Sequence, residues 1–223
     1  MKRVIVIPAW NEATAIAPVV AAAVQVADAV VVVDDGSTDA TGEAARSAGA
    51  IVVRHAVNRG LGGALGTGIA AALVLGADAI VTMDADGQHR TEDAVRIFKR
   101  LEAGDVDFVM GSRMLNASGN MPLRRRIANR LGNWLTWALF GTMVSDSQSG
   151  LRGLSRSAAA DLELRTNGME VSSEFIKLIR DRHWRWAEVA IPAIYTDYSL
   201  SKGQGFLVGV RTAFKLVFRR FVG

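Results

Sequence analysis

The sequence predicts an α/β fold in which helices cover both faces of a mostly parallel, Rossmann-like sheet. Through residue 113, short runs rich in Val and Ile alternate with Ala-rich runs of helical length. The short runs are almost continuously apolar, as expected for parallel strands buried on both faces. A polar segment follows each strand, where open α/β sheets bind their ligands. These three observations predict a ligand crevice at the carboxyl ends of the strands.

Strands and helices are expected in alternation as far as residue 111. Each expected strand is a run of β-branched residues, and each expected helix is a longer run with apolar periodicity. We expect strands at Arg3–Ile7, Ala29–Asp34, Ile51–Arg54, Ala79–Asp84 and Phe108–Gly111. We expect helices at Thr14–Val26, Thr38–Ala48, Leu61–Leu75 and Thr91–Ala103.

The alternation ends after residue 113. A loop over residues 116–122 is expected to lead into a helix that begins with three arginines and ends with aromatic residues. A polar loop at Asp146–Ser149 precedes a short segment, Gly150–Leu154, to which we assign no element. The later elements are expected to be helices at Leu123–Phe140, Val171–Arg182 and Phe206–Val222 and a strand at Ala187–Ile191. The last helix is basic and amphipathic, which fits either a membrane surface or packing on its own domain.

The composition predicts one domain and excludes several kinds of site. The chain has 223 residues, 50% of them hydrophobic, and no cysteine, so zinc–thiolate sites, iron–sulfur clusters and cysteine nucleophiles are excluded. The apolar run after Met1 stops too early for a signal peptide, and no apolar run is long enough to span a bilayer. We expect a cytoplasmic protein that meets the membrane only peripherally, at its cytoplasmic face.

Charge is distributed unevenly along the chain. Residues 1–111 carry 9 basic and 14 acidic residues, a net charge of −5, whereas residues 112–223 carry 17 and 8, a net charge of +9. This asymmetry suggests one region that holds cations and another that meets anions. The candidate anions are a phosphorylated substrate, an anionic membrane and nucleic acid. Nucleic acid is not expected as a partner, because no module that binds it is recognisable.

Two carboxylates separated by one residue, Asp84 and Asp86, follow a buried strand. They can approach one hard divalent cation, Mg²⁺ or Mn²⁺, which favours oxygen ligands and shares its site with substrate phosphates. Gln88 is placed to add an amide oxygen. The alternative is a helix cap by Asp86 or Thr91, but a cap needs one carboxylate rather than two and an amide.

The acidic stretch at residues 34–39 follows another strand. Asp35 is expected to point into the crevice, where a carboxylate can bind a base or a ribose hydroxyl. The alternative is a helix cap, with Ser37 or Thr38 starting the next helix, and both roles can hold together if Thr38 is the cap. Gly66 and Gly68 fit a relaxed dinucleotide-binding pattern, but they lie inside a helical run, so close helix packing explains them better.

Arginines supply the candidate phosphate ligands. Arg113 and Arg152 lie beside small residues in the expected crevice, and a guanidinium fork matches phosphate oxygens. For the remaining basic residues a solvated surface is the ordinary alternative. His55, His89 and His183 show no metal-ligand spacing, although His89 has a place near the crevice.

Together these motifs resemble family 2 glycosyltransferases. The resemblance rests on VIPAWNE at 6–12, VDDGSTD at 33–39, NRG at 58–60 and DADGQH at 84–89. The later motifs are GSR at 111–113, the Arg-rich helix, DSQSGLR at 146–152, SSEF at 172–175 and SK at 201–202. They resemble the branch of dolichol-phosphate mannose synthases and polyprenyl-phosphate glycosyltransferases. Trp10, Arg90 and Leu151 depart from the residues usual in the family, which are Tyr, Pro and Phe.

The resemblance implies a single catalytic domain of the GT-A fold over residues 1–223, with a nucleotide-sugar and metal half (1–111) and an acceptor and membrane-facing half (112–223). It implies that the donor is held by Pro8, Trp10, Asn11, Glu12, Asp35, Gly36, Asn58, Gly60 and Asp84. It implies that Asp84, Asp86 and Gln88 hold Mg²⁺ or Mn²⁺. It implies an acceptor phosphate bound by Arg113, Arg125, Arg126, Arg152 and Lys202. Asp86 and Arg113 are the residues expected to be catalytic.

The implied reaction is an inverting, metal-dependent transfer of a sugar from GDP-mannose or a UDP-sugar to a polyprenyl or dolichyl phosphate. A phosphate monoester has a second pKa of about 6 and is already a nucleophile at neutral pH, so no strong general base is required. The runner-up is a related transferase with a soluble saccharide acceptor. A non-catalytic module that binds a nucleotide sugar or a phospholipid is the alternative from another class.

Overall fold

The computed structural model describes residues 1–115 and 123–194, apart from the side chains of residues 123–129, 135 and 139. The expected helix at Phe206–Val222 and Lys202 lie outside the described residues. Arg125 and Arg126 lie on a described helix, but their side chains are outside the described set. The predicted contacts of these three basic residues therefore stay predictions.

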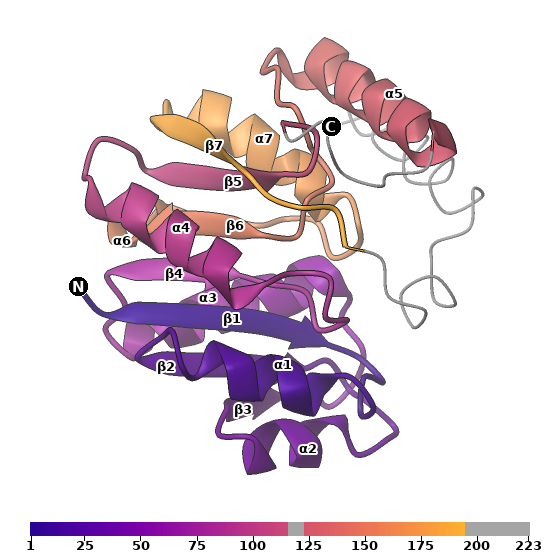
Figure 1. Ribbon diagram of the computed structural model, residues 1–223, viewed down its shortest axis with the longest axis vertical. Coiled ribbons are helices and arrows are strands. Elements are labelled where there is room, and N and C mark those ends of the chain that lie inside the picture. Colours follow the sequence, from indigo (N-terminus) through magenta and orange to yellow (C-terminus); the bar gives the residue numbers. More distant parts are fainter. Residues whose placement is uncertain (116–122, 195–223) are drawn as a thin grey trace.

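A seven-stranded sheet forms the centre of the molecule (Figure 1). Its strands are β1 (Arg3–Ala9), β2 (Ala29–Asp34), β3 (Ile51–Arg54), β4 (Ala79–Thr82), β5 (Phe108–Ser112), β6 (Arg152–Ser155) and β7 (Trp186–Ala190). They lie in the order β3-β2-β1-β4-β6-β5-β7. The pairs β1–β2, β1–β4, β2–β3 and β5–β7 are parallel, whereas β6 runs antiparallel to both β4 and β5. The predicted α/β class with a mostly parallel sheet is confirmed.

Helices cover both faces of this sheet. They are α1 (Ile16–Ala23), α2 (Thr41–Ser47), α3 (Leu61–Val74), α4 (Thr91–Glu102), α5 (Leu123–Phe140), α6 (Arg156–Ala160) and α7 (Val171–Asp181). The core residues of α1, α2 and α4 pack on one face and those of α3, α6 and α7 on the other. Helix α5 lies at one end of the molecule, on the side of β5 and α7, and packs against α7 (Figure 1).

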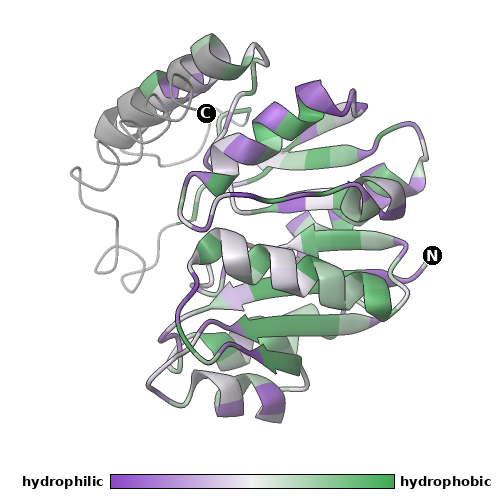
Figure 2. Ribbon diagram, turned by 180° about the vertical axis from the view of Figure 1, so that it is seen from behind, coloured by the Kyte–Doolittle hydropathy of each residue, from purple (hydrophilic) through white to green (hydrophobic). Residues whose placement is uncertain are grey.

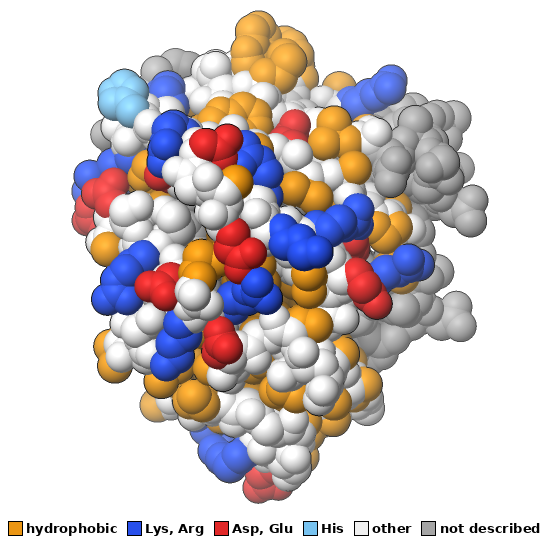
Figure 3. All heavy atoms as spheres, turned by 60° about the vertical axis from the view of Figure 1, so that its left-hand side comes forward, with side chains coloured by type: hydrophobic (Ala, Val, Ile, Leu, Met, Phe, Trp, Pro, Cys, Tyr) orange, Lys and Arg blue, Asp and Glu red, His pale blue; other side chains and the backbone are white. Residues whose placement is uncertain are grey.

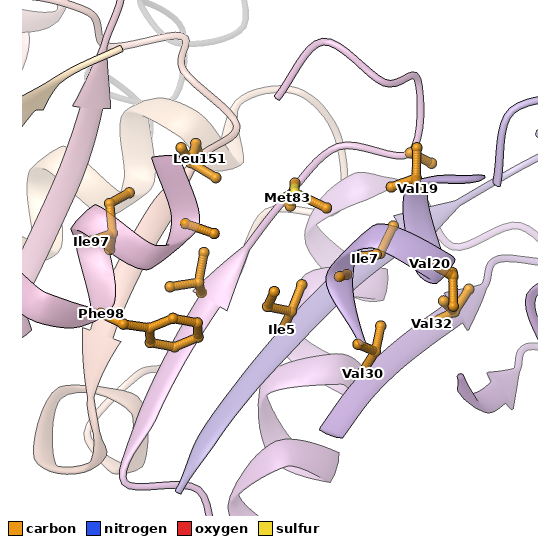
Figure 4. Packing of buried hydrophobic residues seen from close by; sticks show 14 of the residues in the cluster. Ile5, Ile7, Val19, Val20, Val30, Val32, Met83, Ile97, Phe98 and Leu151 are labelled. Carbon is orange, nitrogen blue, oxygen red and sulfur yellow. The ribbon is translucent and has the colours of Figure 1, made fainter. Parts of the chain in front are cut away.

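The two cores follow from the alternation of side chains along each strand. Ile5 and Ile7 of β1 point into the core under α1 and α4, together with Phe98 (Figure 4). Val4 and Val6 point into the opposite core. Each such side chain contributes about 1.5–3 kcal/mol when it is fully buried. The apolar strands stand out at the centre of the fold in Figure 2, whereas the face in Figure 3 carries acidic and basic side chains side by side.

The sequence prediction missed β6 and α6. β6 has only four residues and includes the buried Arg152, so it lacks the apolar run that marked the other strands. The predicted segment Gly150–Leu154 therefore contains a strand that pairs with β4 and β5. This strand carries a charged residue into the centre of the sheet.

The expected cap of α2 is also wrong. The helix begins at Thr41 rather than at Thr38, and its N-cap, Ala40, makes no side-chain cap bond. The Thr38 amide instead donates to the side-chain oxygen of Asn11, 2.9 Å away. Thr38 therefore binds the neighbouring loop, whereas Asp39 accepts from the backbone amide of Thr41, the first residue of α2, over 3.0 Å.

Close packing explains Gly68, as expected. It lies within α3, where a Cβ atom would come within 2.3 Å of a Val6 methyl group on β1. A Cβ at Gly66 would contact nothing within 4 Å. The pattern that resembled a dinucleotide-binding turn is therefore the interior of a helix that approaches the sheet closely at one glycine.

Candidate active site

The loops that follow β1 and β2 form one hydrogen-bonded unit. The Asn11 amide donates to the Ser37 hydroxyl over 3.0 Å, and the Asn11 side-chain oxygen accepts from the Thr38 amide. Asn11 adopts a φ of 54°, a left-handed conformation that Asn tolerates better than most residues. The Glu12 amide donates to the Thr41 hydroxyl over 2.8 Å. These bonds fix the backbone at two predicted donor-binding positions, Asn11 and Glu12, while the adjacent Trp10 remains 53% exposed.

Asp35 holds the chain that leads into α3. Its carboxylate accepts hydrogen bonds from the amides of Arg59 and Gly60, at 2.9 and 2.7 Å, and it is 3% exposed. The packing is tight, because a Cβ at Gly36 would lie 2.7 Å from the amide nitrogen of Asn58. The structure thus brings four predicted donor-binding residues together, with Asp35 bound to backbone amides.

Sequence reasoning assigned no role to His55, which is a partner of Asp35. Its Nδ1 lies 2.6 Å from the Asp35 carboxylate, and its Nε2 lies 3.0 Å from the Thr67 hydroxyl on α3. His55 is 8% exposed. The sequence gave no indication of these contacts, because Asp35 and Thr67 lie 20 and 12 residues away from His55 and a search for closely spaced metal ligands does not detect such pairs.

The N-terminus of α3 rests on a second loop that sequence reasoning missed. The Gly62 amide donates to the Asn167 carbonyl over 2.9 Å, and a Cβ at Gly62 would lie 1.8 Å from the Thr166 carbonyl. Glu174 of α7 accepts from the amides of Arg165 and Thr166, at 2.7 and 2.9 Å, and so holds this loop. Glu174 thereby supports the site without lying in the crevice.

Asp84 and Asp86 lie just beyond β4, which ends at Thr82. Gly150 makes room for Asp84, because a Cβ there would come within 2.4 Å of the carboxylate carbon. The Asp84 side chain is 41% exposed, and one of its oxygens lies 3.1 Å from His89 Nε2. The Asp86 carboxylate accepts a hydrogen bond from the backbone amide of Gln88 over 3.0 Å. The alternative, a helix cap by Asp86 or Thr91, is wrong, since the N-cap of α4 is Arg90 and makes no side-chain cap bond.

The pKa values of the two carboxyl groups move in opposite directions. Burial and the negative charge of Asp84 raise the pKa of Asp86, and the charge of Glu12 adds to this. Burial would also raise the pKa of Asp84, but its bond to His89 and the charges of His89, Arg152 and Arg113 lower it overall. Asp84 therefore lies between a second carboxylate and two guanidinium groups.

This arrangement fits a divalent cation that is shared with a substrate. Two crowded carboxylates repel each other, and a cation between them relieves that repulsion. Among residues 1–115 and 123–194, no group of three or more His, Cys, Asp or Glu side chains could hold a metal ion. Further oxygen ligands would have to come from Gln88, solvent or a bound diphosphate.

Arg113 follows β5 and forms an ion pair with Asp146. Its Nε lies 2.7 Å from one Asp146 oxygen and a terminal nitrogen lies 2.9 Å from the other, while its amide donates over 3.1 Å. Asp146 is fully buried, whereas 19% of the Arg113 side chain is exposed. Such a bidentate pair fixes the plane of the guanidinium. Arg113 therefore reaches solvent in a single defined orientation.

Arg152 of β6 is 2% exposed. Its guanidinium lies 4.9 Å above the Phe175 ring and donates to the Ser172 hydroxyl over 2.8 Å. Burial lowers the pKa of Arg152 to about 10, against the opposite effect of Asp84 and Asp146, so it stays charged at neutral pH. Its Nε has no hydrogen-bond partner among the described residues. The predicted contact of Arg152 with an acceptor phosphate stays a prediction.

A cleft opens beside Asp84 and Arg152, and Asp86, Gln88 and Arg113 are not among its lining residues. It encloses about 310 Å³ of empty space, part of it open to solvent. Pro8 lines it from β1, and Asp84, Gln148, Arg152 and Ser172 supply its polar lining. Three predicted site residues thus share one cleft. Pro8 is the one assigned to the donor, Asp84 the one assigned to the metal, and Arg152 the one assigned to the acceptor phosphate.

Comparison with known proteins identifies the family. The family model described as glycosyl transferase family 2 matches residues 4–162. This chain belongs to glycosyltransferase family 2. An uncharacterized protein of Methanocaldococcus jannaschii is 46% identical to it over 195 residues, covering 86% of this chain and 80% of the relative. A UDP-N-acetylglucosamine–dolichyl-phosphate N-acetylglucosaminyltransferase of Methanococcus voltae is 34% identical over 235 residues, covering 96% of this chain and 94% of the relative.

Solved structures agree with the fold of this family 2 glycosyltransferase. Glucosyl-3-phosphoglycerate synthase from Mycobacterium tuberculosis, in complex with Mn²⁺, UDP-glucose and phosphoglyceric acid, superimposes with a TM-score of 0.76. The two are 21% identical, and the match covers 98% of this chain and 79% of that one. At this identity the similarity supports the GT-A fold alone.

Proposed function

We propose that this glycosyltransferase moves a sugar from a nucleotide-sugar donor to a polyprenyl or dolichyl phosphate, with inversion at the anomeric carbon and with Mg²⁺ or Mn²⁺ as cofactor. One observation carries the proposal. Asp84 and Arg152 line one cleft, and the positive charges of Arg152 and Arg113 act to lower the pKa of Asp84. A pair of carboxylates that suits a cation thus adjoins a guanidinium that suits a phosphate.

On the donor side, Asp84 and Asp86 would hold the cation, with Gln88 as a further oxygen ligand. A bound Mg²⁺ or Mn²⁺ would offset the charge that develops on the departing nucleoside diphosphate. The nucleotide would lie over the joined loops, where Pro8, Trp10, Asn11, Glu12, Asp35, Gly36, Asn58 and Gly60 are assigned to it. Asp35 would act there by shaping the backbone at Arg59 and Gly60, to which it is bonded.

On the acceptor side, Arg113 would orient the lipid phosphate, assisted by Arg125, Arg126, Arg152 and Lys202. A phosphate oxygen attacks the anomeric carbon, the bond to the nucleoside diphosphate breaks, and the bonding electrons leave with the diphosphate. The acceptor is largely ionised at pH 7, so no side chain has to remove a proton. The enzyme's main task is to hold two anions in contact, which fixed arginines and a cation achieve.

The Methanococcus voltae relative supports this acceptor, because its name specifies dolichyl phosphate and its alignment covers almost the whole of both chains. The donor is proposed to be GDP-mannose or a UDP-sugar.

We further propose that the protein binds the cytoplasmic face of the membrane peripherally. Among the described residues, no helix is long and apolar enough to cross a bilayer. Large apolar side chains are nonetheless exposed on and just after α5, namely Leu131, Trp134, Trp137 and Met143, at 63%, 61%, 41% and 66%. Trp residues favour the membrane–water interface. Sedimentation with anionic vesicles should fall in a Trp134→Ser/Trp137→Ser double variant, and unchanged sedimentation would contradict this surface.

The decisive experiment combines purified protein, labelled GDP-mannose and UDP-sugars, Mn²⁺ and a short polyprenyl phosphate. Label should move to the lipid phase with one donor, and EDTA should abolish the transfer. Transfer to a soluble saccharide instead would replace the proposed acceptor. Donor binding without transfer to either acceptor would favour a binding module.

A further inference from the structure

Helix α5 has one side that faces the domain and another that faces solvent. Thr136 and Phe140 are 1% and 8% exposed, whereas Leu131 and Trp134 are 63% and 61% exposed. At 3.6 residues per turn, Asn133 lies on the same side as Thr136 and Phe140. Asn133 is therefore directed toward the body of the protein.

The amide group of Asn133 binds both residues that flank Asp146. Its nitrogen donates to the Ser145 carbonyl over 2.5 Å. Its oxygen accepts from the Ser147 amide and hydroxyl, at 2.9 and 2.8 Å. One side chain of α5 thus binds the turn before and after the aspartate.

The same turn is held from the opposite side by β7. Glu188 accepts from the amide and hydroxyl of Ser145, at 2.8 and 2.7 Å. Between these two anchors Asp146 is fully buried, and its carboxylate receives the bidentate guanidinium of Arg113. A continuous set of hydrogen bonds therefore runs from α5 through the 145–147 turn to Arg113.

We propose that Asn133 is a positioning residue for the acceptor phosphate. By fixing the 145–147 turn it fixes Asp146, and Asp146 fixes the plane and direction of the Arg113 guanidinium. This inference rests on the proposed function, since it assumes that Arg113 meets the acceptor. We therefore expect the position of α5 on the domain to affect the binding of the acceptor. Donor binding should be unaffected, because the donor loops are held by other residues, such as Asn11 and Asp35.

Three variants test this role. Asn133→Leu keeps a similar volume and removes all three hydrogen bonds. Asn133→Asp keeps the acceptor oxygen for Ser147 and loses the donor to Ser145. Thr136→Val is the control, since it also changes a buried polar residue of α5, one turn away and outside the contacts described above.

Asn133→Leu should raise the KM for a short polyprenyl phosphate about tenfold, the size expected for a few lost neutral hydrogen bonds. The KM for the nucleotide sugar should stay within about twofold, Asn133→Asp should fall between the wild type and Asn133→Leu, and Thr136→Val should match the wild type. Equal changes in both KM values, or none, would overturn the positioning role. So would an equal effect of Thr136→Val.

A readout that does not depend on activity is hydrogen exchange of the Ser147 amide, which donates to Asn133. Exchange should be faster in Asn133→Leu than in Thr136→Val, and unchanged exchange would overturn the network. If the wild type itself transfers no sugar to a polyprenyl phosphate, the proposed function fails and the acceptor role fails with it. Transfer by the wild type with an unaltered acceptor KM in Asn133→Leu would overturn the positioning role alone.

Discussion

The two halves of the site are held in different ways. In residues 1–111, the crevice loops are fixed by side chains that bind backbone amides, as Asn11 does with Thr38 and Asp35 with Arg59 and Gly60. In residues 112–194, side chains also bind backbone amides, as Glu174 and Glu188 do, but the candidate phosphate ligand Arg113 is fixed by an ion pair with the buried Asp146. A carboxylate that binds amides shapes the backbone, whereas one that binds arginine orients a cationic group. The first arrangement suits recognition of a nucleotide, and the second suits presentation of positive charge to a phosphate.

The largest effect is expected at the carboxylate pair of the donor half. Asp86→Asn keeps the shape of the side chain and removes its charge, so transfer should fall by about 10²–10³-fold through lost charge stabilisation. The measurement is kcat for sugar transfer at saturating Mn²⁺. The control is Asp105→Asn, because Asp105 is also acidic but is exposed and is not one of the predicted site residues. If kcat fell by less than tenfold, Asp86 would not be a catalytic residue.

The next largest effect is expected at Arg113 in the acceptor half. Arg113→Ala removes the oriented guanidinium and also leaves the buried Asp146 without its partner, so kcat/KM for the acceptor should fall by about 10²-fold. His89→Ala should cost far less, since an ionised phosphate needs no general base. The two variants are compared at equal donor concentration and pH. An equal or greater loss in His89→Ala would contradict a reaction without a base.

A smaller effect, on stability, tests the close packing of the donor half. Gly68→Ala places a methyl group against Val6 and should lower the free energy of unfolding by about 1–3 kcal/mol. Gly66→Ala, in the same helix with open space, should raise it by about 0.5–1 kcal/mol. Urea unfolding of both variants measures the difference. Equal values would show that α3 can move away from β1 at little cost.

The smallest effect tests an ion pair that joins the two halves, Asp107 of the first with Arg185 of the second. Asp107 binds Arg185 through both carboxylate oxygens, each at 3.0 Å, and this bond lowers the pKa of Asp107. A lowered folded-state pKa gives stability that is present above the unfolded value of about 3.9 and is lost as the pH falls through the folded value. Asp107→Asn should therefore cost about 1 kcal/mol at pH 7, and the cost should shrink as the pH falls below about 3.9. A cost that does not change with pH would assign the effect to packing.

The sequence was sufficient for the parts of the fold that repeat a simple pattern. The strands through residue 112 and helices α3 and α4 lie within a few residues of their expected bounds, because a buried parallel strand is an apolar run. β6 broke that rule, since it begins with the buried Arg152, which stacks on the Phe175 ring and donates to the Ser172 hydroxyl. A pattern based on hydropathy does not find a strand whose main buried residue is charged.

The candidate site was predicted where residues act close to their own strand end. Asp84, Asp86 and Arg113 directly follow β4 and β5, so their convergence followed from the topology of parallel strands. The sequence did not predict the roles of His55, Glu174 and Asn133. Each of them supports the site by binding a residue of a loop that lies between 8 and 20 positions away in the sequence. His55 and Asn133 carry no local signal, and the SSEF motif that contains Glu174 gave no indication of the loop that Glu174 holds.

The position of β6 has a consequence for how this molecule can be divided. β6 comes from the second half of the chain, yet it lies between β4 and β5 of the first half. A cut at residue 111 would therefore leave β4 and β5 with no strand to join them, and the acceptor half would lose both neighbours of β6. The position at which the chain changes from donor-binding to acceptor-binding residues is therefore not a boundary between two separate parts of the structure. New acceptors would have to be accommodated by changes in loops and in α5 around a shared sheet, and not by exchange of one half for another.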